Sequence, residues 1–110
     1  MERSYLGEFE ELVLLATAVL EDGAYGLTIV SELKQRTNRS ISLSGVHVAL
    51  YRLEEKGLLS SELGGATASR GGRRKRMFRV TASGQQTLDN IRQVRNELYD
   101  AIPGISLSPR

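Results

Sequence analysis

The sequence predicts a mainly α-helical fold with a small β-hairpin, and three observations lead to that class. Apolar residues recur at helical spacing in successive segments that together span residues 5–56. Two short segments at 58–63 and 74–80 flank a glycine-rich stretch, as the strands of a hairpin do. A last amphipathic segment follows over residues 81–104. The chain has 110 residues and no cysteine, which fits one small domain.

The first two helices are predicted from their apolar spacing. Residues of about 5–21 form one amphipathic segment, and Gly23 marks its end. Its apolar positions are Leu6, Phe9, Leu12, Val13, Ala16, Val19 and Leu20. A second helix is expected over residues 25–37, with polar residues from Asn38 onward ending it. The side chains expected on its buried side are Leu27, Val30 and Leu33.

The third helix carries two different stripes. Ser42 or Ser44 is expected to accept a hydrogen bond from the free N–H groups of its first turn. Gly57 supplies the left-handed conformation that closes many helices. The inner stripe consists of Val46, Ala49, Leu50 and Leu53. The opposite stripe consists of Ser44, His47, Val48, Tyr51 and Glu55.

A hairpin and a final helix complete the chain. The strands are expected at about Leu58–Leu63 and Arg74–Val80, and Thr81 or Ser83 begins the last helix. That helix carries the stripe Leu88, Ile91, Val94, Leu98 and Ile102, and it ends at Pro103-Gly104. Three helices followed by a hairpin form the winged version of the helix-turn-helix. We therefore expect this domain over residues 1–80, an added helix over 81–104 and a flexible tail over 105–110.

Charge is distributed very unevenly along the chain. Residues 1–32 hold seven acidic side chains and one basic, a net charge of −6, whereas residues 33–80 hold eleven basic and three acidic, a net charge of +8. Residues 81–110 balance, so the total of +2 conceals the asymmetry. A basic middle favours a surface that meets a polyanion. Ordinary solvated surface charge is the alternative interpretation.

Several function classes are excluded by composition. Without cysteine there is no disulfide scaffold or thiolate chemistry, and the single His47 rules out a multi-histidine metal site within one chain. No nucleophile elbow or phosphate-binding loop is present, and adjacent Glu54 and Glu55 point to different sides of a helix. We expect no enzyme activity, no metal and no cofactor.

The sequence also predicts a cytoplasmic protein that does not associate with membranes. The start lacks the order of a signal peptide. The longest apolar stretch, Leu12 to Leu20, has nine residues and is too short to cross a bilayer.

The hairpin loop and the third helix are the candidate DNA-binding elements. Six of the ten residues from 70 to 79 are basic, which suits phosphate contacts, and an arginine at a hairpin tip can enter a minor groove. A flexible solvated loop, RNA or acidic lipid are alternatives for this cluster. The residues expected to contact DNA are Ser42, Ser44, His47, Val48, Tyr51, Arg52, Arg70, Arg73, Arg74 and Lys75.

The outer stripe of the third helix would carry sequence readout. Ser44 and His47 lie in the first turn, where they could hydrogen-bond base edges, and Val48 could touch a thymine methyl group. Tyr51 and Arg52 would reach phosphates. For His47 the alternative is a surface residue without a role, and for Tyr51 it is a half-buried core residue.

The order of several motifs resembles the PadR family of transcriptional regulators. These are Tyr25-Gly26, the run Leu50-Tyr51-Arg52-Leu53-Glu54-Glu55-Lys56-Gly57-Leu58-Leu59, the wing Gly71-Gly72-Arg73-Arg74-Lys75, and Phe78-Arg79-Val80-Thr81 with Gly84. The resemblance runs from about Leu6 to Asn96. It implies a winged helix-turn-helix homodimer that binds a palindromic operator in double-stranded DNA, usually as a repressor. A protein-binding or RNA-binding module is the alternative.

The resemblance also implies how such a protein dimerises and responds. The last helix would pack against the partner's first helix, through Phe9, Leu12, Leu88, Ile91, Val94, Leu98 and Ile102; a helix folded onto its own core would show the same stripe. Small-molecule effectors act on some family members, and Tyr5, Phe9 and Tyr99 could line such a pocket or simply pack in the core. Ser44, His47 and Val48 depart from the family's usual helix start, and His47 replaces a tyrosine that usually contributes to DNA contact.

Overall fold

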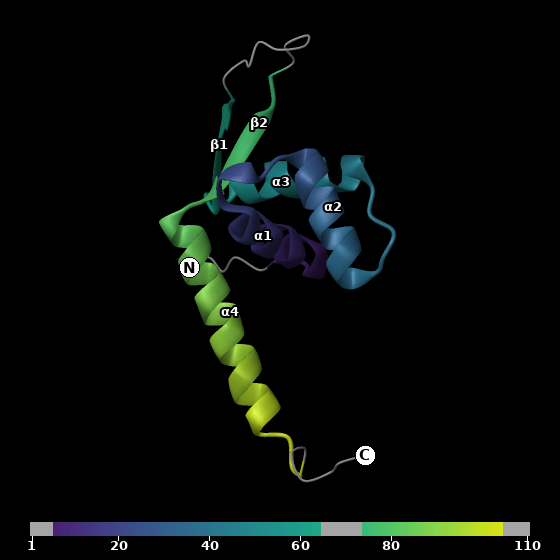
Figure 1. Cartoon of the computed structure of the whole chain (residues 1–110). Helices are drawn as coiled ribbons and strands as arrows, with labels where there is room; N and C mark the ends of the chain where they lie inside the picture. The colour runs from purple at the N-terminus through teal and green to yellow at the C-terminus, as the bar shows by residue number, and fades with distance from the viewer. Residues whose placement is uncertain (1–5, 65–73, 105–110) are drawn as a thin grey trace.

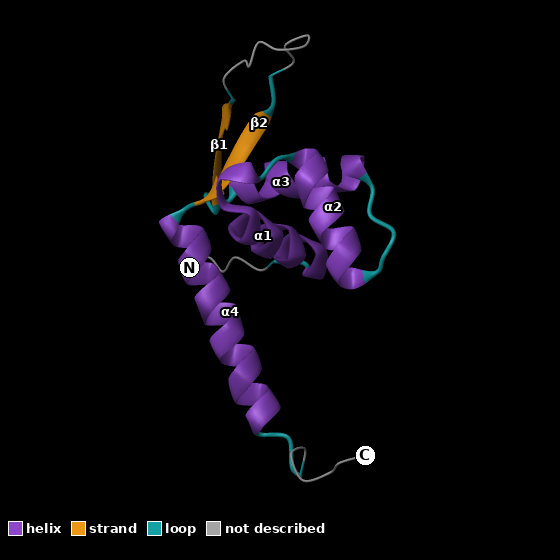
Figure 2. Ribbon diagram, viewed as in Figure 1, coloured by secondary structure: helices purple, strands orange, loops and turns teal. Residues whose placement is uncertain are grey.

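Three helices form the body of the molecule: α1 (Glu8–Leu20), α2 (Gly26–Thr37) and α3 (Leu43–Glu55). A short 3-10 turn, η1 (Glu21–Gly23), follows α1. The computed structural model describes residues 6–64 and 74–104. In Figures 1 and 2 the hairpin rises from one side of this body, and the last helix runs away from it. The predicted mainly α-helical winged fold with a small hairpin is confirmed.

The core lies where the three helices meet the hairpin. Its largest fully buried side chains are Phe78, Leu14, Ile29, Leu50, Leu53, Val13, Val46 and Thr17. The predicted inner stripe of α3 is buried throughout. The prediction for Leu27 was wrong, because this side chain is 59% exposed. Ile29 and Leu33, one turn apart, set the inward face of α2, and Leu27 points away from that face.

The hairpin is one antiparallel pair, β1 (Leu59–Leu63) with β2 (Arg76–Val80). Leu59 lies opposite Val80 and Ser61 lies opposite Phe78. Phe78 is buried, and its backbone N–H donates to the carbonyl of Ala24 at 2.9 Å. The hairpin is therefore joined to the segment between α1 and α2 by a hydrogen bond as well as by apolar packing. The glycine-rich loop, residues 65–73, lies outside the described residues, as does the predicted tail at 105–110.

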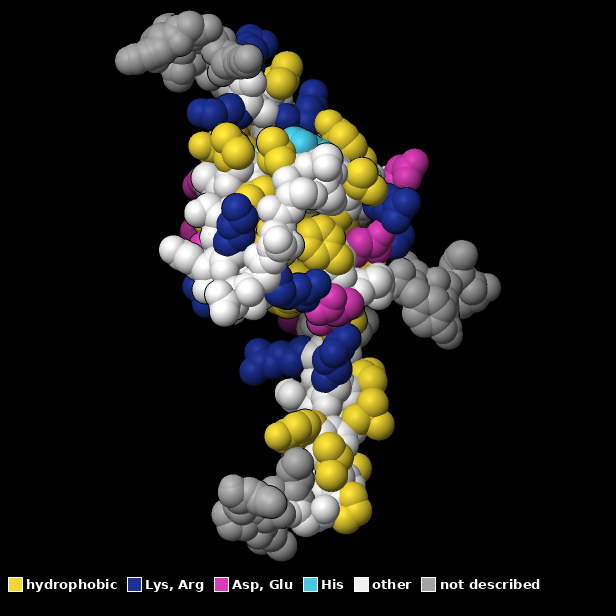
Figure 3. All heavy atoms as spheres, turned by 90° about the vertical axis from the view of Figure 1, so that its right-hand side faces the viewer, with side chains coloured by type: hydrophobic (Ala, Val, Ile, Leu, Met, Phe, Trp, Pro, Cys, Tyr) yellow, Lys and Arg dark blue, Asp and Glu magenta, His cyan; other side chains and the backbone are white. Residues whose placement is uncertain are grey.

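Helix α4 (Ala82–Asp100) is anchored at its start and exposed beyond it. The Thr81 hydroxyl accepts from the Gly84 N–H at 3.0 Å and donates to the Gly57 carbonyl at 2.8 Å. Leu88 joins the core, whereas Val94, Leu98, Tyr99 and Ile102 are exposed. Figure 3 shows hydrophobic side chains along this projecting part of the molecule. No helix within residues 6–64 and 74–104 combines the length and apolar character needed to cross a membrane.

Gly84 provides the first test of how α4 is held. A Cβ atom at this position would lie 2.2 Å from the Leu58 carbonyl oxygen, which is backbone and cannot move aside freely. We expect Gly84→Ala to lower the free energy of unfolding by about 3 kcal/mol, since the clash exceeds the gain of about 1 kcal/mol in helix propensity.

Chemical denaturation measures this effect, with Gly23→Ala as the control. Nothing lies within 4 Å of a Cβ atom at Gly23. That control should change stability by less than about 0.5 kcal/mol. Equal stability of the two variants would contradict the close packing of α4 on Leu58.

Candidate nucleic-acid interface

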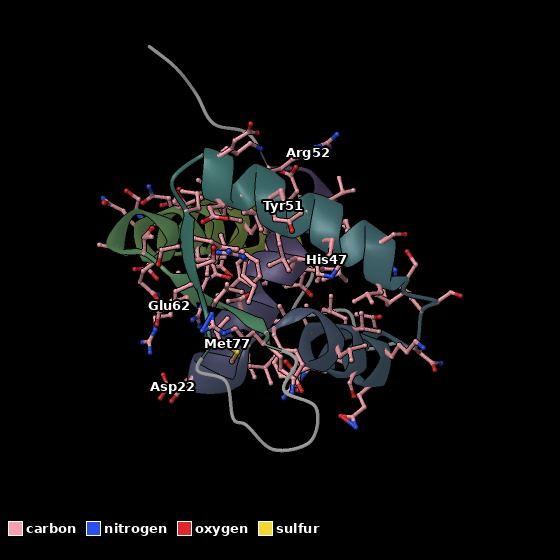
Figure 4. The ribbon with its side chains drawn as sticks, turned by 90° about the horizontal axis from the view of Figure 1, so that it is seen from above. Asp22, His47, Tyr51, Arg52, Glu62 and Met77 are labelled. Carbon is pink, nitrogen blue, oxygen red and sulfur yellow. The ribbon has the colours of Figure 1, made fainter. Side chains whose placement is uncertain are left out.

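The outer face of α3 is exposed at most of its positions. Ser42 is the residue that caps the helix, and its hydroxyl accepts from the Gly45 N–H at 3.0 Å. Ser44, Val48, Tyr51 and Arg52 are all exposed, with Val48 at 50% and Tyr51 at 54%. Figure 4 shows His47, Tyr51 and Arg52 following one another along α3. This face therefore offers hydroxyl, apolar and cationic groups to a partner.

His47 is more enclosed than its neighbours on this stripe. A Cβ atom placed on Gly26 would lie 3.0 Å from the His47 Cε1 atom, so the ring rests against the first residue of α2. The ring also stacks on Tyr51, with centroids 6.1 Å apart and planes inclined by 21°. Its Nδ1 atom is buried and has no hydrogen-bond partner within the described residues. His47 thus holds α3 against α2 and supports the Tyr51 ring.

The start of α2 connects this face to the hairpin. The Lys75 ammonium group lies 4.8 Å from the centroid of the Tyr25 ring, in a cation–π contact. Tyr25 precedes Gly26, on which His47 packs. A continuous series of contacts therefore runs from the wing, through the start of α2, to the outer face of α3.

A second connection lies near the C-terminal end of α3. The Ser61 hydroxyl donates to the Glu54 carboxylate at 2.7 Å and accepts from the Arg76 guanidinium at 3.0 Å. These bonds join the C-terminal part of α3 to both strands. The orientation of the wing relative to α3 is thus set by polar contacts as well as by the core.

Acidic side chains of α1 and η1 neutralise several of the basic residues. Within the described residues, five ion pairs span distant parts of the chain: Arg39 with Glu8, Arg52 and Lys56 with Glu10, Arg79 with Asp22, and Arg95 with Glu11. A hydrogen bond to Glu8 and the charge of its carboxylate raise the pKa of Arg39 above its ordinary value. Such exposed pairs contribute little to stability. Their main effect is to neutralise some of the basic side chains, which leaves net positive charge on the others.

Positive charge without an ion pair remains at the base of the wing. Within the described residues, Arg74 and Lys75 are exposed and form no ion pair. The predicted contacts Arg70 and Arg73 lie outside the described residues. Arg52 lies 4.0 Å from Glu10, at the flank of the α3 face.

The residues predicted for a dimer interface fall into two groups. Leu88 is buried in the core of its own chain, and Phe9 and Leu12 pack partly against that core. Ile91 is half-buried, whereas Val94 and Leu98 are exposed on the part of α4 that leaves the body, and Ile102 is exposed just beyond the end of α4. Only the second group presents a large apolar surface outside the monomer.

Sequence reasoning missed the junction between α2 and α3 as part of the site. Tyr25, Gly26, Leu27 and Leu43 all lie there, and only Tyr25-Gly26 carried a signal, as a family motif. Leu27 and Leu43 are apolar and exposed. Both stand in apolar segments of the sequence, so the sequence alone did not reveal that they face outward.

These elements define a winged helix-turn-helix domain, with an exposed third helix beside a basic hairpin. The chain belongs to the transcriptional regulator PadR-like family, whose family model matches residues 14–90. Members of this family are DNA-binding regulators rather than enzymes, which confirms the expected class.

Solved structures agree with this assignment. A PadR family regulator from Eggerthella lenta is 27% identical with a TM-score of 0.67, covering 94% of this chain and 88% of that one. A PadR-like transcription factor from Bacteroides fragilis is 26% identical with a TM-score of 0.69, covering 88% of each chain. PadR of Bacillus subtilis, solved in complex with operator DNA, is 23% identical with a TM-score of 0.61, covering 76% of this chain and 45% of that one. No curated protein matches the chain.

The contact between Gly26 and His47 generates a second prediction. Gly26→Ala would crowd the His47 ring and the Leu43 side chain, each 3.0 Å from the new Cβ atom, and should cost about 1–2 kcal/mol of stability. In Gly26→Ala/His47→Ala the ring is absent, so the double variant should lose less than the sum of the two single variants. Denaturation of all four proteins measures this coupling. Additive losses within about 0.5 kcal/mol would show that the ring does not rest on Gly26.

Proposed function

We propose that this protein is a dimeric repressor that binds a palindromic operator in double-stranded DNA, with α3 in the major groove and the wing on the flanking backbone. The observation that carries the proposal is the series of contacts from Lys75 through Tyr25 and Gly26 to His47. It joins an exposed helix face and basic residues without ion pairs into one surface. Family membership and the operator complex of a similarly folded protein support it.

The predicted residues take different roles in this proposal, and His47 supports the outer face of α3 by packing on Gly26 and Tyr51. Ser44 and Val48 face base edges, and Tyr51 and Arg52 face phosphates. Ser42 caps α3. Its hydroxyl oxygen already accepts a hydrogen bond from the Gly45 N–H, so that lone pair is not available to a base. Arg74 and Lys75 contact phosphates, and Arg70 and Arg73, which lie outside the described residues, add further phosphate contacts in this proposal.

Salt dependence tests the role of the wing. We expect Arg74→Ala to weaken binding to every DNA sequence and to lower the slope of log K against log salt by up to about 0.9, because one phosphate contact is lost. The triple change of Arg73, Arg74 and Lys75 to Ala should lower it further. Fluorescence anisotropy at several salt concentrations measures both quantities.

Arg92→Ala is the matched control for the wing. Arg92 is also an exposed arginine, but it lies on α4, away from the hairpin. Its removal subtracts the same charge and should leave the slope unchanged. Equal slopes for the two variants would place the phosphate contacts elsewhere.

The proposed dimer forms through the projecting part of α4. Val94, Leu98 and Ile102 recur at helical spacing and stay exposed in one chain, with Leu98 at 66%. Leu88 would anchor α4 to the core of its own chain and would not contact the partner subunit. Phe9 and Leu12, which are half-buried on α1, would border the interface. The two α3 helices would then reach successive major grooves about 34 Å apart.

A charge on this stripe should separate the subunits. Leu98→Asp should weaken the dimer by about 3 kcal/mol, more than a hundredfold, because a carboxylate would be buried without a partner. Asn96→Asp adds the same charge on the opposite side of α4 and should remain dimeric. Sedimentation equilibrium distinguishes these outcomes. A wild-type protein that is monomeric at micromolar concentration would contradict the proposed dimer.

The proposal also includes a small-molecule effector that releases the protein from DNA, as the resemblance to the family implies. Phe9 and Tyr99 lie on α1 and α4, the two helices proposed to meet across the dimer, and Tyr5 lies outside the described residues. An effector bound among these side chains would act on the dimer and not directly on α3.

A further inference from the structure

The base-facing part of α3 lacks the side chains that usually read guanine and adenine. Residues 42–51 contain no Arg, Lys, Asn or Gln. Arginine and lysine make the commonest contacts to guanine, and asparagine and glutamine make those to adenine. Arg52 lies beyond this stretch, 4.0 Å from Glu10. Apart from the imidazole of His47, which is half-buried and has its Nδ1 atom enclosed, direct readout by this stretch must therefore use hydroxyl groups and apolar contacts.

Apolar surface is what this part of the molecule exposes. Val48 is half exposed at the middle of the α3 face, and Leu43 is 40% exposed at its start. The Leu43 side chain reaches the Gly26 position, next to exposed Leu27 on α2. Val48 and Tyr51 also line a shallow open depression with Arg52, Glu54 and Glu55. These apolar groups are not required by the core, since the opposite stripe of α3 fills it.

The charges around this apolar surface favour DNA over a protein partner. Lys75 is linked to the junction through Tyr25, and Arg74 and Arg76 are exposed beside it on the hairpin. Residues 38–53 contain no acidic side chain. Glu54 and Glu55 border the depression only toward the C-terminal end of α3. The N-terminal part of the apolar surface, which carries no acidic side chain, is complementary to a groove bordered by phosphates. The thymine C5-methyl is the apolar group that base pairs present in the major groove.

We propose that α3 recognises its operator through thymine methyl groups, with Val48 as the specificity-determining residue. Each half-site carries a thymine at the position that faces Val48. Ser44, one turn earlier, adds a hydroxyl that can bond to several bases and so discriminates less. This inference rests on the proposed DNA-binding function and names the chemistry that the same face reads.

Replacing thymine by uracil tests the proposal, because uracil lacks only the C5-methyl group. An operator is first selected from random DNA with the full-length protein. Each half-site thymine is then replaced by uracil, singly and in symmetric pairs, and affinity is measured at fixed salt. At the position that faces Val48, we expect replacement of thymine by uracil to lower the affinity about fourfold per half-site. This is the loss of affinity expected when one buried methyl group is removed.

Variants assign the contact to Val48. Val48→Ala should bind thymine and uracil operators equally at that position, and Val48→Thr, which keeps one methyl group, should retain part of the difference. Ser44→Ala is the matched control on the same face and should keep the full difference. Val48 is half exposed, so these variants should fold, and thermal unfolding verifies it.

The outcomes separate this inference from the function on which it rests. Specific operator binding that is insensitive to uracil at every half-site thymine would overturn methyl readout and leave the DNA-binding function intact. A uracil effect that persists unchanged in Val48→Ala would overturn the assignment to Val48. Failure to select any sequence would instead overturn the proposed function, and a protein bound at Val48 would then be the occupant of this face.

Discussion

The close approach of α2 to α3 at Gly26 is the constraint on which the candidate interface depends. Because glycine has no Cβ atom, the His47 ring and the Leu43 side chain can both lie against the start of α2. This fixes the outer face of α3 relative to Tyr25, whose ring receives Lys75 from the hairpin. One small residue in the body therefore determines how a helix face and a wing are placed together.

The same fold brings acidic and basic side chains from distant parts of the chain together. The acidic residues at the start of the chain do not form a free acidic surface, because Glu8, Glu10 and Glu11 pair with basic residues from three other parts of the chain. Asp22 in η1 does the same with Arg79. Much of the unevenness seen in the sequence thus becomes local neutralisation around the body. Among the described basic residues that form no ion pair, Arg74, Lys75 and Arg76 gather at the hairpin, whereas Lys34 and Arg92 lie singly on α2 and α4. A polyanion would meet the densest positive charge at the hairpin.

Local patterns made much of the fold predictable. The inner stripe of α3 and the caps at Ser42 and Thr81 depend on residues within one or two turns, which the sequence displays directly. The orientation of Leu27 and the enclosure of His47 depend on how two helices cross, and no local pattern contains that information. The cation–π contact of Lys75 with Tyr25 joins residues 50 positions apart, so it also required the tertiary structure.

The attachment of α4 shows how the two parts of the proposed regulator are coupled. Strand β2 passes into α4 through Thr81, whose backbone N–H and hydroxyl donate to the carbonyls of Leu58 and Gly57. The direction of α4 is therefore set at the base of the hairpin, and Leu88 holds the next turn in the core. In a dimer joined through the exposed part of α4, the spacing of the two α3 helices would follow from this rigid start. A shift at the interface would be transmitted to the wing through the same residues, because no flexible linker lies between β2 and α4.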